Sequence, residues 1–151
     1  MNSTEHVFSI KDLENLSGVK AHTIRIWEKR YNLLKPKRSK TNIRHYDLNN
    51  LQKLLNISFL NSNGFKISKI AALDETELAP KTRELAFMGK NDSQAIVAFK
   101  LAMLNFDQIL FYNTYNSLLE EKNFRTIFYE VFIPLLFDLG MLWQTNTISP
   151  S

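Results

Sequence analysis

Hydrophobic residues in the first part of the chain recur at the spacing of short helices. The first stripe consists of Ile10, Leu13, Leu16 and Val19. Apolar residues three or four positions apart predict a helix with one buried face. Ser9 precedes this stripe and Asp12 lies three residues further on, which is close to a capping box. Gly18 follows the last turn and favours a tight helix end, because it has no Cβ.

A second stripe predicts a helix over residues 21–31. The side chains expected to face the core are Ile24, Trp27 and Tyr31. The side chains left on the opposite face are His22, Arg25 and Lys29. Two short helices joined by a glycine-containing turn are typical of a helix-turn-helix. We therefore interpret this segment as a helix with one anchored side and one basic side.

Residues 34–46 do not follow a helical pattern. They are rich in proline, serine, threonine and asparagine, and their length suits a β-hairpin with its tip at residues 39–42. A Leu-rich helix follows from a cap at Asp47, and a short helix over residues 67–73 completes the segment. A basic hairpin directly after a basic helix predicts a wing.

The second half of the chain is predicted to form a bundle of three or four helices. The stripes expected to face its core are Ile96, Phe99 and Met103; Ile109, Tyr112, Tyr115 and Leu119; and Phe128, Val131, Leu135, Leu139 and Trp143. Residues 81–88 are the candidate for a fourth helix. Pro134 falls inside the last stripe and predicts a kink, because proline lacks the N–H that a helix interior needs.

The polar stretch DETELAP, residues 74–80, predicts a linker between two domains. Residues 1–73 would form a winged helix-turn-helix and residues 81–151 an incomplete helical bundle, so the predicted fold class is mainly α with one small hairpin. The charge supports this division. Residues 1–73 hold 13 Lys or Arg and 5 acids, whereas residues 74–151 hold 6 and 10. Only the first segment is suited to a polyanion.

The basic charge is concentrated in residues 20–46, which hold nine Lys or Arg and one acid, Glu28. This surface favours double-stranded DNA, because contacts between cations and phosphates dominate the affinity of DNA-binding proteins. The helix over residues 21–31 would enter the major groove, and the hairpin over residues 35–46 would lie on the backbone or minor groove. The candidate DNA contacts are Lys20, His22, Thr23, Arg25, Trp27, Lys29, Arg30, Lys37, Arg38, Asn42, Arg44, His45 and Tyr46.

Several other classes of function are disfavoured. The chain has no cysteine, and its histidines lack ligand spacing, so we expect neither disulfides nor a metal site. It carries no glycine-rich phosphate loop, nucleophile elbow or paired-carboxylate motif, so we do not expect an enzyme. No signal peptide and no apolar run of about 18 residues are evident, so we expect a soluble cytoplasmic protein without a membrane partner.

The run TIRIWEKRYNLLKPKR, followed by TNIRHYD, resembles the N-terminal domain of the MerR family of transcription regulators. The matching residues are Thr23, Ile24, Arg25, Trp27, Glu28, Pro36, Arg38, Arg44 and Tyr46. The resemblance covers residues 8–73. It departs at Lys20, where a small capping residue is usual, and at Asn32 and Asn42, where glycine is usual. It implies a sequence-specific DNA-binding regulator with RNA polymerase as a further partner. We expect the bundle to receive a signal or to mediate self-association, which would otherwise need a further domain.

The sequence is most similar to the light- or cobalamin-responsive branch of this family at Trp27 and at the Arg30-Tyr31 pair. In that branch a helical bundle precedes a Rossmann-like cobalamin domain. The resemblance aligns Trp143 with the bundle tryptophan that covers the cofactor, although this residue also suits an ordinary bundle core. The Glu-His pair of that branch would fall beyond Ser151, and its Asp-x-His-x-x-Gly loop is absent. We therefore expect part of a longer sensor, with no cofactor in this chain and adenosylcobalamin as the ligand of the parent protein.

Two other interpretations stay open. An excisionase-like architectural protein would use a similar winged domain to bend DNA, although such proteins are usually too small to carry a bundle. Alternatively, the bundle would be a protein-interaction module and the basic half its anchor. Salt separates these interpretations. DNA binding through about six phosphate contacts weakens about a thousandfold between 50 and 200 mM salt, whereas an aromatic protein interface barely changes.

Overall fold

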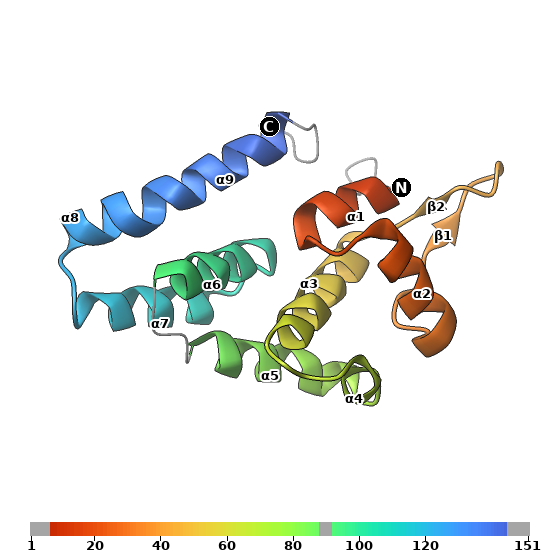
Figure 1. Cartoon of the computed structure of the whole chain (residues 1–151), viewed down its shortest axis with the longest axis horizontal. Coiled ribbons are helices and arrows are strands. Elements are labelled where there is room, and N and C mark those ends of the chain that lie inside the picture. Colours follow the sequence, from red (N-terminus) through yellow and green to blue (C-terminus); the bar gives the residue numbers. More distant parts are fainter. Residues whose placement is uncertain (1–6, 88–91, 145–151) are drawn as a thin grey trace. The chain divides into compact units, whose positions relative to one another are not determined.

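The computed structural model describes residues 7–87 and 92–144. These residues are mostly helical with one short hairpin (Figure 1), which confirms the expected fold class of a winged helix-turn-helix followed by a helical bundle. The chain divides into two compact units, Met1–Ala79 and Pro80–Ser151. Each unit has buried hydrophobic residues of its own.

The N-terminal unit contains the helix-turn-helix and the hairpin. Its described elements are α1 (Ile10–Ser17), α2 (Ala21–Tyr31), β1 (Lys37–Arg38), β2 (Arg44–His45), α3 (Leu48–Ser62) and α4 (Ile67–Ala71). The two strands are antiparallel, with Lys37 opposite His45 and Arg38 opposite Arg44. Figure 1 shows the hairpin extending away from α1 and α2. The helix-turn-helix and wing predicted from the sequence are therefore both present.

The helix ends form as their capping residues predict. Ser9 and Asp12 exchange two hydrogen bonds of 3.0 Å across the first turn of α1, and Gly18 ends this helix with a φ of 78°. Asn32 ends α2 with a φ of 53°, and Asn42 in the hairpin has a φ of 63°. Asparagine enters this left-handed region more readily than most other residues. Both asparagines therefore take the conformation that glycine would have supplied.

A core of aliphatic side chains holds the N-terminal unit together. Its fully buried members include Leu13, Ile24, Leu51, Leu54, Ile57 and Leu60. Phe8 and Tyr46 form a β-bridge, with N–H to carbonyl distances of 2.7 and 2.8 Å. This bridge joins the segment before α1 to the end of the hairpin. The basic helix and the base of the hairpin are therefore both held on the core of the N-terminal unit.

The polar stretch over residues 74–80 is not an extended linker, because α5 (Glu75–Phe87) runs through it. Asp74 Oδ1 accepts a hydrogen bond from the backbone N–H of Thr76 at 3.3 Å, and acids in the first turn suit the positive end of a helix dipole. Pro80 lies inside this helix, where it has no N–H to donate. The polar composition belongs to a capped helix start, and the division between the two units falls inside α5.

The second unit is built around Phe99. Its remaining described elements are α6 (Asp92–Leu104), α7 (Gln108–Leu119), α8 (Phe124–Ile127), the π-helical η1 (Phe128–Phe132) and α9 (Ile133–Gln144). The buried core consists of Ala95, Phe99, Ile127, Val131 and Leu135. The Phe99 ring lies 4.8 Å from the ring of Phe111 and 5.3 Å from that of Phe132, edge-on in both cases, which is a favoured aromatic geometry. Phe99 thereby joins α6, α7 and η1.

Two of the expected bundle stripes are wrong in part. On α6, Phe99 is buried but Met103 is 41% exposed. On α7, Ile109 and Tyr112 are 59% and 61% exposed, and Leu110 is buried instead. These helices carry apolar residues on several sides, so apolar spacing alone does not identify the buried face.

A π-helical turn lies just before Pro134, the residue at which a kink was predicted. The backbone N–H of Ile133 donates to the carbonyl of Phe128, five residues back rather than four. Pro134 has no N–H, so it cannot pair with the carbonyl of Glu130 four residues before it. The wider turn ends at Phe132, two residues before the proline, and it accommodates this missing hydrogen bond.

Candidate nucleic-acid interface

Helix α2 has one buried side and one exposed basic side. Ile24 is fully buried. The side chains exposed on the other side include His22, Arg25 and Lys29. Trp27 and Tyr31, which were expected to face the core, are only partly buried, and the Arg30 guanidinium lies 5.7 Å from the centroid of the Tyr31 ring. Helix α2 therefore offers cationic donors from a fixed position.

The start of α2 is held by a residue of α1. Lys20 occupies the N-cap position and makes no side-chain cap. Glu14 supplies the acceptor instead, because its Oε1 accepts a hydrogen bond from the backbone N–H of Ala21 at 3.1 Å. The Lys20 residue is exposed. The departure from a small capping residue is thus compensated across the turn, and it adds a cation at the start of α2.

The wing, residues 35–46, has a tip closed by short polar contacts. The backbone N–H of Ser39 donates to the carbonyl of Ile43 at 3.0 Å. Arg38 Nη1 donates to Oδ1 of Asn42 at 3.3 Å. The exposed cations of the hairpin include Lys37, Arg38 and Lys40. The wing is therefore a narrow, positively charged projection.

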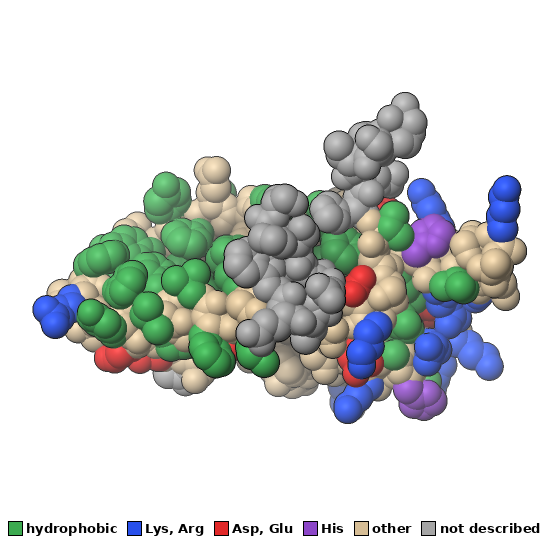
Figure 2. All heavy atoms as spheres, turned by 90° about the horizontal axis from the view of Figure 1, so that it is seen from above, with side chains coloured by type: hydrophobic (Ala, Val, Ile, Leu, Met, Phe, Trp, Pro, Cys, Tyr) green, Lys and Arg blue, Asp and Glu red, His purple; other side chains and the backbone are tan. Residues whose placement is uncertain are grey.

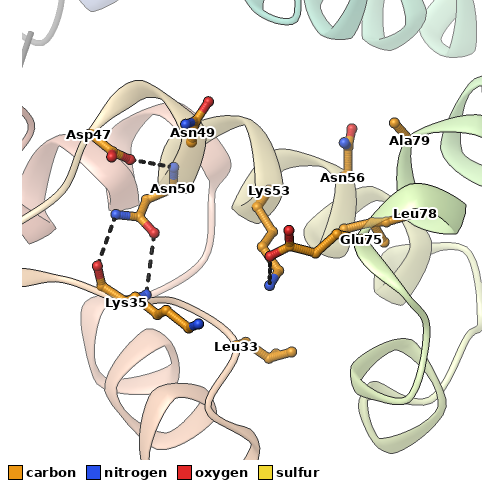
Figure 3. A pocket seen from close by; sticks show the side chains of 10 residues that line it. All are labelled: Leu33, Lys35, Asp47, Asn49, Asn50, Lys53, Asn56, Glu75, Leu78 and Ala79. Atoms are coloured by element: carbon orange, nitrogen blue, oxygen red, sulfur yellow. Dashed lines mark hydrogen bonds and ion pairs between the residues drawn. The ribbon is translucent and has the colours of Figure 1, made fainter.

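Asn50 fastens the start of the wing to α3. Its Oδ1 accepts from the backbone N–H of Lys35 and its Nδ2 donates to the Lys35 carbonyl, each at 3.3 Å. The Asn50 backbone N–H donates to Asp47 Oδ1 at 2.9 Å. Figure 3 shows these bonds along a pocket of about 510 Å³, where Lys53 also pairs with Glu75 at 3.4 Å. Polar groups along this pocket therefore hold the protein's own backbone in place.

Glu28 of α2 is the shared partner of two wing residues. Its Oε2 accepts a hydrogen bond of 2.6 Å from the Tyr46 hydroxyl, and its Oε1 lies 3.3 Å from Nε of Arg44. The Glu28 side chain is only 7% exposed and that of Arg44 is 28% exposed. Burial raises the pKa of Tyr46 above its ordinary value of 10.0, and the hydrogen bond to Glu28 raises it further. Tyr46 is therefore a neutral donor to a buried carboxylate.

The predicted DNA contacts differ in exposure. The exposed ones are Lys20, His22, Arg25, Lys29, Arg30, Lys37, Arg38 and Asn42. The partly buried ones are Thr23, Trp27, Arg44 and His45. Tyr46 is 1% exposed, so its prediction as a direct contact is contradicted. Its hydroxyl is bonded to Glu28, and its place in the protein is structural.

The exposed charge of the N-terminal unit is mostly positive. Figure 2 shows Lys and Arg side chains gathered over the part of the molecule that carries α2 and the wing. Sequence reasoning missed the roles of Glu14, Glu28 and Asn50. For Glu28 a signal existed, because it is the single acid among residues 20–46. Glu14 and Asn50 bond to positions seven and fifteen residues away, which no local pattern predicts.

Two kinds of feature are absent from residues 7–87 and 92–144. No group of three or more His, Asp or Glu side chains is placed so that it would hold a metal ion in these residues. In the same two segments, no helix combines the length and the apolar character needed to cross a membrane.

A helix-turn-helix with an exposed basic helix and a β-hairpin wing defines a class of DNA-binding regulatory domain. Residues 8–77 match the family model described as "MerR HTH family regulatory protein". This segment is therefore a MerR-family helix-turn-helix domain, and the resemblance seen in the sequence is confirmed.

One curated relative is similar along almost the whole chain. The chain is 28% identical over 151 residues to the HTH-type transcriptional repressor CarH of Myxococcus xanthus. The match covers 96% of this chain and 50% of the relative. The chain thus spans about half the length of the curated relative that it matches.

The bond between Tyr46 and Glu28 predicts how stability depends on pH. The raised pKa of Tyr46 means that ionisation is easier in the unfolded chain than in the folded one. The contribution of Tyr46 to the free energy of unfolding is therefore fully present below about pH 10. It is lost as the pH rises further, by up to about 1.4 kcal/mol per pH unit. Tyr46→Phe should cost about 1 to 3 kcal/mol at pH 7 and should flatten this alkaline loss. Urea unfolding between pH 7 and pH 11 measures both effects.

Tyr112→Phe is the matched control, because Tyr112 lies on the surface of α7. It removes the same hydroxyl group without touching Glu28, so its pH dependence should follow that of the wild type. An equally steep alkaline loss in Tyr46→Phe and in the wild type would show that other groups cause the loss.

Proposed function

We propose that residues 8–77 bind double-stranded DNA, with α2 in the major groove and the wing on the backbone or minor groove beside it. The observation that carries this proposal is the pair of exposed basic elements held on one core. An α-helix fits the major groove of B-DNA, and a cationic hairpin beside it is suited to phosphates or to the narrower groove. The family match supports the same function.

The proposed contacts fall into two groups. Lys20, His22 and Thr23 belong to the start of α2, from which side chains of a recognition helix reach base edges. The proposed phosphate and sugar contacts are Arg25, Lys29, Arg30, Lys37, Arg38, Asn42, Arg44 and His45. The partly buried Trp27 is proposed to support α2 from its edge. The first group would specify sequence, and the second would supply affinity.

The proposed function of the whole chain is that of a sequence-specific transcription regulator. The similarity to a transcriptional repressor over 96% of the chain supports this reading. A contact with RNA polymerase stays a prediction. The cofactor prediction also stays open, because the side chain of Trp143 lies outside the described residues. Binding of adenosylcobalamin is accordingly proposed only for a longer parent protein.

The proposed role of the second unit is signal reception or self-association, and its surface favours self-association. On the described part of α9, the exposed apolar residues include Ile133, Leu136, Phe137 and Met141, and their spacing sets them on one helical face. Figure 2 shows many hydrophobic side chains on the surface of this unit. Soluble monomers rarely expose a large contiguous apolar patch, so this face supports a contact between copies of the chain.

Self-association predicts a mass in sedimentation equilibrium that exceeds the 17.6 kDa of one chain and rises with protein concentration. Phe137→Gln should lower this mass at a given concentration, because it places a polar amide on the exposed apolar face of α9. Its unfolding midpoint should change little, since Phe137 is 71% exposed. A mass of 17.6 kDa at every concentration would contradict this part of the proposal.

The DNA proposal predicts a loss of affinity in Arg25→Ala. The exposed Arg25 should contribute about 1 to 3 kcal/mol to binding of a selected duplex. If it contacts a phosphate, the slope of log K against log salt should also decrease by about 0.9 in magnitude. Fluorescence anisotropy titrations between 50 and 200 mM salt give both quantities.

Arg125→Ala provides the control for charge and composition. Arg125 is exposed on α8, where its guanidinium lies 5.8 Å from the Tyr129 ring. The Arg125→Ala substitution removes one positive charge from the second unit and should leave the DNA affinity almost unchanged. Equal losses in the two variants would mean that net charge, rather than a placed contact, accounts for binding.

A further inference from the structure

Glu28 has an unusual position for an acid in a basic segment. It is the only acid among residues 20–46, and its side chain is 7% exposed. A carboxylate on a surface that faces DNA would repel phosphates. Here it is withdrawn from the surface, and each of its oxygens faces a wing residue, Oε2 towards Tyr46 and Oε1 towards Arg44.

The wing has few internal means to keep its position. Each of its strands is two residues long, and a short isolated hairpin is at best marginally stable in water. The exposed cations on the wing and on α2 carry the same sign, so they repel one another until phosphates lie between them. Contacts at the base of the wing therefore determine where its tip lies before DNA binds.

Among the described residues, the contacts that hold this base include three sets. Asn50 joins Lys35 to α3, and Phe8 joins Tyr46 to the segment before α1. The contacts of Glu28 differ from both, because they run directly from α2 to the wing. They connect the two elements that would contact the same DNA duplex, so their relative position would affect DNA binding.

We propose that Glu28 is a positioning residue for DNA recognition, which sets the distance and angle of the wing relative to α2. This inference rests on the proposed DNA-binding function. A binding surface held in its bound geometry loses less entropy on association. Glu28 would thus increase the affinity for DNA without touching it, although its negative charge alone would decrease that affinity.

Glu28→Gln separates these two effects. The amide oxygen still accepts a hydrogen bond from Tyr46, but the negative charge that pairs with Arg44 is gone. Glu75→Gln is the matched control, because Glu75 lies in the same unit, is 78% exposed and pairs with Lys53 on α3 rather than with the wing. Both variants make the unit more positive by one charge. If charge alone matters, both should bind any duplex slightly more tightly.

A double-mutant cycle with Lys40 at the wing tip tests the positioning directly. Lys40 is exposed at the wing tip, and it is proposed as a further phosphate contact of the wing. Lys40→Ala in the wild type should therefore weaken binding of a selected duplex roughly fivefold or more. In the Glu28→Gln background the same change should cost less than about twofold, because the wing no longer reaches its place. In the Glu75→Gln background it should cost as much as in the wild type. Equal costs in all three backgrounds would overturn the inference.

Amide hydrogen exchange without DNA provides a second readout. The Asn42 N–H donates to the Ser39 carbonyl at 2.8 Å within the wing, and its exchange reports opening of the tip. Exchange at Asn42 should be faster in Glu28→Gln than in Glu75→Gln, while the amides of α1 and α3 keep their protection. Faster exchange throughout the unit would mean a general loss of stability and would contradict a positioning role. An unchanged exchange rate at the Asn42 amide would also contradict a positioning role.

The two proposals fail in different ways. If the wild-type chain binds no duplex at any salt concentration, the proposed function fails and the inference fails with it. If the wild type binds DNA and Lys40→Ala costs the same with and without Glu28, only the inference fails. In that case Glu28 is an ordinary structural acceptor beneath a DNA-binding surface.

Discussion

The contacts of the buried Glu28 carboxylate with Tyr46 and Arg44 are the interaction on which the arrangement of the basic surface depends. A surface that attracts a polyanion collects like charges, and like charges oppose the close packing of the elements that carry them. The protein meets this constraint with one acid placed under the surface, where it accepts a hydrogen bond from Tyr46 and pairs with Arg44. Helix α2 and the wing are thereby joined without an exposed negative charge.

The same principle extends to the rest of the N-terminal unit, where polar groups that face inward hold the backbone of the basic segment. Glu14 caps α2 in place of Lys20, and Asn50 ties the start of the wing to α3. The cations of this segment are therefore exposed, except for Arg44, which is partly buried and pairs with Glu28. Because inward-facing polar groups hold the backbone, a segment with nine Lys or Arg can remain folded.

Much of this unit could be predicted from the sequence, because its signals are local. The capping pair Ser9 and Asp12, the turn at Gly18 and the left-handed Asn42 each act within a few residues. The bond from Tyr46 to Glu28 spans 18 positions and depends on the fold, so Tyr46 was wrongly predicted as a DNA contact. In the second unit, apolar residues occur on several faces of α6 and α7, and their spacing could not identify the buried face. The polar stretch before Pro80 resembled a linker because a capped helix start has the same composition.

We propose that the chain recognises a particular DNA sequence through α2 and the wing. The most direct test is selection of bound duplexes from a random DNA pool by the full 151-residue chain near physiological salt. Sequence-specific recognition predicts enrichment of one motif. Two copies of that motif about 34 to 36 Å apart, or a multiple of that distance, would indicate binding by two copies of the chain. Retention of DNA without any motif would contradict sequence-specific recognition and favour an architectural role. No retention at all would contradict DNA binding itself.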